Sequence, residues 1–316
     1  MAQVTMKEML DAGVHFGHQT ERWNPRMKNF VFGARQGIHI IDLQKSVAQA
    51  KRAAEFIQKV AASGGKLIFV GTKKQAVEPI LEAAKKCGQS YMTKRWLGGT
   101  LTNFSTIKNS IDRLRKIEQM KDKGNFDLLT KKERAKIEKE GGRLTEYLEG
   151  IRDMKDTPKA MFVVDIVKEH IAIAEARKLH IPVIAIVDTN ADPSQVDFPI
   201  PGNDDAIRSI KLFANLVADS FLDGAKEWEQ KLRSESDKQV DLADQKDQPV
   251  REARPRGKAK ETKPEVVAAA PGAGPAVVRV AKARKLVAAG LADEVEIQAE
   301  LDSDKAEQDE TTPEEK

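Results

Sequence analysis

Short apolar runs and longer amphipathic segments alternate along the first 230 residues. Continuous apolar runs such as LIFVG, AMFVVD and IPVIAIVD are typical of strands that are buried on both faces. Between them, segments such as LQKSVAQAKRAAEFIQKVAA and VKEHIAIAEARKL repeat apolar residues every three or four positions, which predicts helices. Strands that alternate with helices favour an α/β fold with a mostly parallel, doubly wound sheet.

Residues 103–151 break this alternation. Asn103 can cap a first helix, and Thr130 with Glu133 forms a capping box for a second, highly charged helix. Each helix has only a narrow apolar stripe, and the glycine pair at 141–142 should weaken or bend the second one. We therefore predict an antiparallel, coiled-coil hairpin inserted between the two parts of the sheet domain, residues 1–102 and 152–230.

The apolar periodicity ends near residue 231. The residues that follow are rich in Pro, Ala, Gly and charged side chains, and the chain ends in the acidic stretch DSDKAEQDETTPEEK. A segment of this composition buries too little apolar area to offset the entropy that ordering would cost. We therefore predict that residues 231–316 form a disordered tail.

Positive charge is concentrated at the start of the chain. The sequence holds 53 Lys and Arg against 49 Asp and Glu, a net charge of only +4, but residues 1–124 alone hold 22 basic and 10 acidic residues. Such an excess suits a polyanionic partner, although an ordinary solvated surface would show it as well. The charge therefore has to be weighed together with the position of the cations.

The composition disfavours several classes of protein. The single cysteine, Cys87, can form neither an internal disulfide nor a cysteine-rich zinc site, and its apolar, helical surroundings predict a buried thiol. No run of about 18 uncharged apolar residues occurs, and Lys7 and Glu8 stand where a secretory signal would be apolar. We therefore expect a cytoplasmic protein without a membrane partner.

A parallel sheet can hold a ligand at the carboxyl ends of its strands, but the sequence lacks the usual motifs. No three-glycine dinucleotide fingerprint follows LIFVG, and neither a phosphate-binding GxxxxGKS/T run nor a GxSxG elbow occurs. We predict no catalytic residue, cofactor, metal or small-molecule substrate, and expect the first two histidines to make local hydrogen bonds. The alternative, a metal-dependent small-molecule enzyme, would use His15, His18, Asp165, Asp188, Asp192, Asp204 and Asp205.

Basic and aromatic residues are interleaved in two predicted loops, RWNPRMK at residues 22–28 and KRWLGG at residues 94–99. Loop cations can neutralise phosphates, asparagines can hydrogen-bond sugar or base, and glycines allow a backbone to approach closely. Two lysines at a helix start add to this, because the N-terminus of a helix attracts phosphate. The tryptophans should fix the shape of the loops rather than stack on bases. The predicted RNA-binding residues are Arg22, Trp23, Asn24, Arg26, Lys28, Arg35, Lys73, Lys74, Lys94, Arg95, Trp96 and Asn103.

These motifs resemble a known family. The segments MLDAGVHFGHQTERWNPRMKNFVFGARQGIHIIDL, FVGTKKQA, RWLGGTLTNF and FPIPGNDDAIRSI are closely similar to ribosomal protein S2 of the bacterial small subunit. The resemblance covers about residues 1–230 and leaves the tail aside. It implies a flavodoxin-like sheet with an inserted helical hairpin, no enzymatic activity, and a place on the solvent side of the small subunit between head and body.

The resemblance also implies partners. Members of the family contact 16S ribosomal RNA and help to recruit ribosomal protein S1, so we expect these two molecules and neighbouring small-subunit proteins to be the partners. The family's RNA-facing segments coincide with the loops selected here for their charge. The hairpin would be a second contact element, toward RNA or protein, and a docking scaffold built around it is a third interpretation.

Overall fold

The computed structural model describes residues 4–123, 126 and 129–246. It contains a parallel sheet of five strands in the order β5-β4-β6-β7-β8. Numbered by their place along the chain, these strands follow the order 2-1-3-4-5, which is that of flavodoxin-like, doubly wound sheets. The predicted α/β class and parallel sheet are confirmed. The strands are β4 (Leu67–Val70), β5 (Ser90–Met92), β6 (Ala160–Val164), β7 (Val183–Val187) and β8 (Phe198–Pro201).

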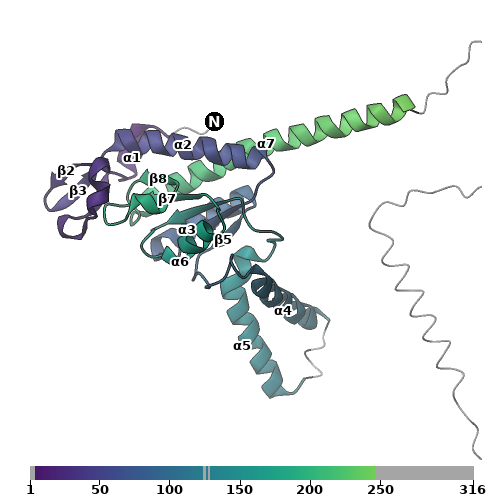
Figure 1. Ribbon diagram of the computed structural model, residues 1–316. Coiled ribbons are helices and arrows are strands. Elements are labelled where there is room, and N and C mark those ends of the chain that lie inside the picture. Colours follow the sequence, from purple (N-terminus) through teal and green to yellow (C-terminus); the bar gives the residue numbers. More distant parts are fainter. Residues whose placement is uncertain (1–3, 124–125, 127–128, 247–316) are drawn as a thin grey trace, which may run out of the picture. The chain divides into compact units, whose positions relative to one another are not determined.

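Helices cover both faces of the sheet (Figure 1). One face packs against α2, α3 and α7, and the other against α6 and the segment that precedes α4. Successive strand residues alternate between the faces, so Phe69 lies in one core and Val70 in the other. Because both faces are buried, the three central strands, β4, β6 and β7, are apolar throughout. The helices are α1 (Met6–Asp11), α2 (Leu43–Ala62), α3 (Lys74–Cys87), α6 (His170–Lys178) and α7 (Ile207–Lys246).

A small antiparallel sheet lies near the start of the chain. Its strands, in their order across the sheet, are β1 (Phe16–Gln19), β3 (Ile38–Ile41) and β2 (Val31–Arg35). Two 3-10 turns, η1 (Thr20–Arg22) and η2 (Pro25–Phe30), connect β1 to β2. The sequence pattern predicted only a polar loop and apolar residues here, because strands of four or five residues carry too little alternation to be recognised.

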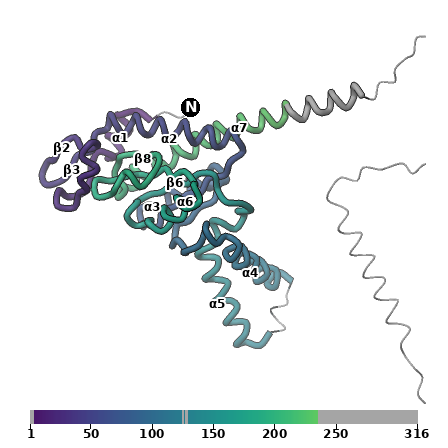
Figure 2. The backbone as a smooth tube through the Cα atoms, viewed as in Figure 1, coloured from purple at the N-terminus to yellow at the C-terminus, as the bar shows by residue number. Residues whose placement is uncertain are grey.

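Two helices, α4 (Phe104–Asp122) and α5 (Lys131–Leu148), extend away from the parallel sheet as a pair (Figures 1 and 2), and η4 (Glu149–Ile151) follows α5. The predicted capping box of Thr130 and Glu133 is present, whereas Asn103 occupies the N-cap of α4 without a side-chain bond to the backbone. α5 is continuous through its glycine pair, and the predicted weakening or bend at these residues stays a prediction. A Cβ at Gly141 would lie 3.1 Å from Cγ2 of Ile117, so this glycine lets the two helices approach closely. Their pairing as a coiled coil stays a prediction.

Helix α7 continues to Lys246, past the boundary predicted at residue 230. Residues 231–246 contain Ala, Lys, Gln, Glu and Leu, which favour helix without needing an apolar face. The rest of the predicted tail, residues 247–316, lies outside the described residues. Along the described ranges, no helix combines the length and the apolar character needed to cross a membrane.

Strand β8 forms one edge of the parallel sheet and contains two prolines. It pairs with β7 in a register that places Ala185 beside Pro199 and Val187 beside Pro201. Proline has no backbone N–H, so β8 lacks a donor at both of these positions.

Candidate nucleic-acid interface

The first basic loop, residues 22–28, is anchored by the buried side chain of Met27, by a hydrogen bond from the Asn24 N–H to the Thr189 carbonyl at 2.8 Å, and by contacts nearer the surface. The side chain of Asn24 caps η2 by accepting a hydrogen bond from the backbone N–H of Arg26 at 3.0 Å. The guanidinium of Arg26 forms an ion pair with Asp192. Trp23 is 39 % exposed and packs against the ring of His39, with the ring centroids 5.3 Å apart. This loop is therefore held by one core side chain and by surface contacts, and none of these contacts is with a buried carboxylate.

The second basic loop, residues 94–102, is folded around one buried carboxylate. Glu175 of α6 is only 8 % exposed. Its Oε1 accepts hydrogen bonds from Trp96 Nε1 at 3.0 Å and from the backbone N–H of Gly99 at 2.7 Å. Its Oε2 accepts from the backbone N–H of Leu101 at 2.9 Å, and from the backbone N–H and Oγ1 of Thr102 at 3.1 and 3.2 Å. Five donors of the loop thus converge on a single side chain.

These hydrogen bonds keep Glu175 ionised. Burial, the largest influence, acts to raise the pKa of Glu175, but the hydrogen bonds from Trp96 and from the backbone of Thr102, Leu101 and Gly99 together lower that pKa below its ordinary value. Hydrogen bonds to a carboxylate favour its charged form, because the donors are positioned for an anion. The loop therefore encloses a fixed negative charge.

The buried glutamate changes the role predicted for the loop. The backbone of Gly99 adopts a φ of +88°, in the left-handed region, and its N–H points to Glu175 rather than outward to a phosphate. Trp96 is 5 % exposed and shapes the loop, as predicted. Glu175 itself was not predicted, since it looks like an ordinary helical glutamate. Its place between the buried Ala172 and Ala176 on α6 was the signal that could have revealed it.

The predicted cations fall into three groups. Two of them are exposed but paired: Arg26 with Asp192, and Lys94 with Glu146 at 3.5 Å. Lys73 is partly buried among carboxylates. The remaining five are exposed and form no ion pair with an acidic side chain in the part of the chain that the structure describes. These five are Arg22, Lys28, Arg35, Lys74 and Arg95.

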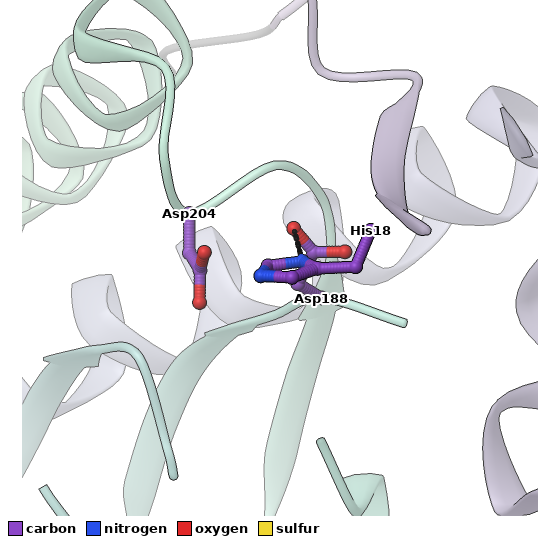
Figure 3. A group of neighbouring side chains, drawn as sticks. All are labelled: His18, Asp188 and Asp204. Atoms are coloured by element: carbon purple, nitrogen blue, oxygen red, sulfur yellow. Dashed lines mark ion pairs between the residues drawn. The ribbon is translucent and has the colours of Figure 1, made fainter. Parts of the chain in front are cut away.

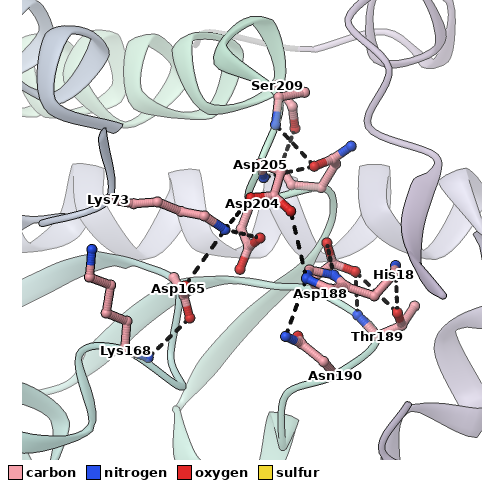
Figure 4. A network of polar contacts seen from close by, with 12 residues as sticks. His18, Lys73, Asp165, Lys168, Asp188, Thr189, Asn190, Asp204, Asp205 and Ser209 are labelled. Carbon is pink, nitrogen blue, oxygen red and sulfur yellow. Dashed lines mark hydrogen bonds and ion pairs between the residues drawn. The ribbon is translucent and has the colours of Figure 1, made fainter. Parts of the chain in front are cut away.

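Lys73 belongs to a polar network at the carboxyl ends of the parallel strands (Figure 4). Its Nζ lies 2.8 Å from Asp204 Oδ1, 2.5 Å from Asp205 Oδ1 and 3.6 Å from Asp165 Oδ2. Lys73 follows β4, Asp165 follows β6, and the two consecutive aspartates follow β8. The sheet therefore gathers acidic residues that are far apart in the sequence, because parallel strands end at the same edge.

His18 of β1 reaches the same network. A Cβ at Gly17 would lie 2.6 Å from Cγ2 of Thr189, so this glycine allows β1 to approach the end of β7. His18 then donates its backbone N–H to Thr189 Oγ1 at 3.0 Å, and its Nδ1 lies 3.0 Å from Asp188 Oδ2. One ligand atom of each of His18, Asp188 and Asp204 lies within 4.8 Å of the others (Figure 3), so these side chains could hold a metal ion.

Excess negative charge shifts the titration of this network. The hydrogen bond to Asp188 is the largest influence on His18 and raises its pKa. Burial, with the charge of Asp188 adding to it, raises the pKa of Asp204 to about 7. Burial acts to lower the pKa of Lys73, but its hydrogen bonds to Asp204 and Asp205 raise that pKa above its ordinary value. Lys73 is therefore a charged residue whose ammonium group is paired with aspartates of the same chain.

His15 and Asp192 lie outside this network. The Nδ1 of His15 is buried and has no hydrogen-bond partner among the described residues. Its ring packs against that of Phe16, with centroids 4.0 Å apart, and burial lowers its pKa. The predicted local hydrogen bond is wrong for this nitrogen, because the ring serves as a packing surface. His18 does make the predicted local bonds.

Comparisons with known proteins add to this geometry. Residues 9–224 match the family described as "Ribosomal protein S2". A protein of Bdellovibrio bacteriovorus, named "Small ribosomal subunit protein uS2", is 67 % identical over 310 residues, which cover 96 % of this chain and 97 % of that protein. This second match extends beyond the family match into the C-terminal segment, so that segment has a counterpart in the relative.

Proposed function

The chain belongs to the ribosomal protein S2 family, and on that premise we propose that it binds 16S ribosomal RNA through its basic loops and helps to dock ribosomal protein S1. It is a structural protein of the small ribosomal subunit, and thus part of the ribonucleoprotein that carries out translation. The family is not enzymatic, which sets aside the metal-dependent enzyme considered from the sequence. We place its work in the cytoplasm, where bacterial subunits translate.

The observation that carries the RNA proposal is the group of five exposed cations without acidic partners, namely Arg22, Lys28, Arg35, Lys74 and Arg95. A cation paired with a carboxylate must give up that partner before it can bind a phosphate, whereas an unpaired one loses only water and counterions. Release of the counterions condensed on RNA then favours binding. Arg26 and Lys94 would contribute by exchanging a surface carboxylate for a phosphate, and surface ion pairs are weak enough to permit this.

The test replaces Arg22, Lys28, Arg35 and Arg95 together by Ala and measures co-sedimentation with small subunits that lack this protein. We expect affinity to fall at least about tenfold at moderate salt, and the slope of log affinity against log salt to shrink by about 0.7 to 0.9 for each phosphate that is no longer neutralised. The matched control replaces Lys51, Arg52, Lys59 and Lys85, which are exposed on α2 and α3. Equal losses in both variants would contradict the assignment, since only the net charge would then matter.

A second observation supports a protein partner. Phe32 of β2 is 81 % exposed, and Phe16 and Ile38 on the neighbouring strands of the antiparallel sheet are exposed as well. An apolar surface of this kind gains nothing from a phosphate and is typical of protein contacts. We propose that it contributes to docking S1, and that the α4/α5 hairpin is a further contact element.

Replacing Phe32 by Ala should reduce the amount of S1 retained on purified subunits, while this chain itself stays bound. Ile207, which is 53 % exposed at the start of α7, provides the control when it is replaced by Ala. Unchanged retention of S1 in the Phe32 variant would remove this part of the proposal and leave the RNA part intact.

A further inference from the structure

We propose that Glu175 is the positioning residue of the second basic loop, and that it holds residues 96–102 in the shape that presents Lys94 and Arg95 to ribosomal RNA. The inference rests on the RNA-binding function proposed above. Glu175 is buried and acidic, so it cannot itself touch a phosphate. Its part in binding RNA is to position the cations of the loop.

The first step of the argument is the convergence of donors. Three backbone N–H groups, one hydroxyl and one indole N–H of the loop donate to the two oxygens of Glu175. A cradle of backbone N–H groups is a ready binding site for an anion. Here the protein's own carboxylate fills the cradle. The N–H groups of Gly99, Leu101 and Thr102 are therefore not available to phosphates, which leaves the exposed side chains of Lys94 and Arg95 as the contacts that this loop offers to RNA.

The second step is the position of those side chains. Lys94 and Arg95 are exposed and directly precede Trp96, which is buried and bonded to Glu175. The hydroxyl of Thr100 donates to the carbonyl of Leu97 at 2.6 Å and closes the turn that follows. Glu175 fixes the indole of Trp96, and Trp96 in turn sets the direction of the chain at the preceding residue, Arg95.

The third step concerns energy. Two donors meet Oε1 of Glu175 and three meet Oε2, so replacing either oxygen leaves two or three donors without an acceptor, and unsatisfied buried polar groups are costly. In a Glu175→Gln variant the side-chain volume is kept, but one acceptor oxygen becomes an N–H₂ donor facing other donors. We therefore expect the loop to rearrange locally while the sheet, which packs through apolar residues, stays folded.

The experiment is a double-mutant cycle on the full chain, with affinity measured for small subunits that lack this protein. Glu175→Gln should weaken binding by about threefold to tenfold, a difference of roughly 1 kcal/mol. Lys94→Ala with Arg95→Ala should weaken it by a similar factor. The combined variant should be no weaker than the variant without the two cations, because Glu175 acts only through them.

The control is Glu169→Gln. Glu169 is also buried and accepts bonds from the backbone N–H and the hydroxyl of Thr72, away from this loop. Its effect should add to that of the Lys94 and Arg95 replacements. Hydrogen exchange gives a direct readout of position: the N–H groups of Gly99, Leu101 and Thr102 should exchange faster in Glu175→Gln than in Glu169→Gln.

The outcomes separate the two proposals. If removing Lys94 and Arg95 weakens binding but Glu175→Gln has no effect or adds fully to it, the positioning role is wrong and the RNA interface stands. If removing the two cations leaves affinity unchanged, both the positioning role and this part of the interface are wrong. Should Glu175→Gln fail to fold, Trp96→Phe removes one of the five donors and should show about a twofold loss with the same lack of additivity.

Discussion

The two basic loops look alike in sequence and are held in different ways. Each places an arginine beside a tryptophan, in RWNPRMK and in KRWLGG. In the first loop Trp23 stays 39 % exposed and the arginine side chain of Arg26 reaches an acid near the surface. In the second loop Trp96 is 5 % exposed and is bonded to Glu175 inside the protein. The same pattern of cation and aromatic therefore does not reveal whether the tryptophan lies at the surface or is bonded to a buried acid.

The largest expected difference between the loops is in stability. Replacing Trp96 by Ala should lower the free energy of unfolding by about 3–5 kcal/mol, because it leaves a cavity and removes a donor from Glu175. Replacing Trp23 by Ala should cost only about 1 kcal/mol, because part of its ring already faces water. Urea unfolding followed by circular dichroism measures both. Equal losses of unfolding free energy in the two variants would show that the two tryptophans do not differ in their contribution to stability.

Two buried acids, Glu175 of the second loop and Asp204 of the network that includes His18, should respond to pH in opposite directions. The pKa of Glu175 is lowered from its ordinary value of 4.5, so its contribution to stability is present above that value and is lost as the pH falls through the folded-state pKa. The pKa of Asp204, in the network that includes His18, is raised from 3.8 to about 7. Its contribution is present below pH 3.8 and is lost as the pH rises through about 7.

Substitutions sharpen this contrast. Relative to the unaltered protein, Asp204→Asn should become more stable by about 1–3 kcal/mol between pH 4 and pH 8, whereas Glu175→Gln should become less stable as the pH rises from 3 to 6. Unfolding free energies measured across pH 3–8 give both slopes. If the difference in unfolding free energy from the unaltered protein changed with pH in the same direction for both variants, the pKa values of Asp204 and Glu175 would not be shifted in opposite directions.

The smallest effect is expected at the surface ion pair of the first loop. Replacing Arg26 by Ala removes its ion pair with Asp192, yet exposed pairs contribute at most about 1 kcal/mol. Thermal unfolding should therefore shift only slightly, while binding to subunits weakens if Arg26 exchanges Asp192 for a phosphate. A large thermal shift would mean that the first loop depends on this ion pair as much as the second depends on Glu175.

Much of the fold could be predicted from local patterns. The apolar runs LIFVG, AMFVVD and IPVIAIVD became β4, β6 and β7 because strands covered on both faces leave no polar positions. The capping box at Thr130 and the buried state of Cys87 were also predicted, since each depends on near neighbours. The antiparallel sheet was missed because its pairing joins segments that are polar or contain glycine.

The candidate interface was less predictable, for a physical reason. Whether a cation is free depends on acids that arrive from distant parts of the chain. Lys73 was selected for its place at a helix start, but its acidic partners follow strands more than ninety residues away, at Asp165, Asp204 and Asp205. Glu175 was missed because its partners lie on a loop more than seventy residues earlier. Contacts between residues so far apart in the sequence depend on the topology of the fold, which cannot be deduced from local residue spacing.

The two prolines of β8 bear on the life of the chain before it joins a ribosome. β8 is an edge strand of the parallel sheet, so one side of it has no neighbouring strand. An unpaired edge strand can pair with a strand of another chain, which is a route to aggregation. Pro199 and Pro201 remove two backbone donors from β8, and the carbonyl of Pro201 already accepts from the Ser46 hydroxyl of α2 at 2.6 Å, so this edge is a poor template for a second copy of the chain.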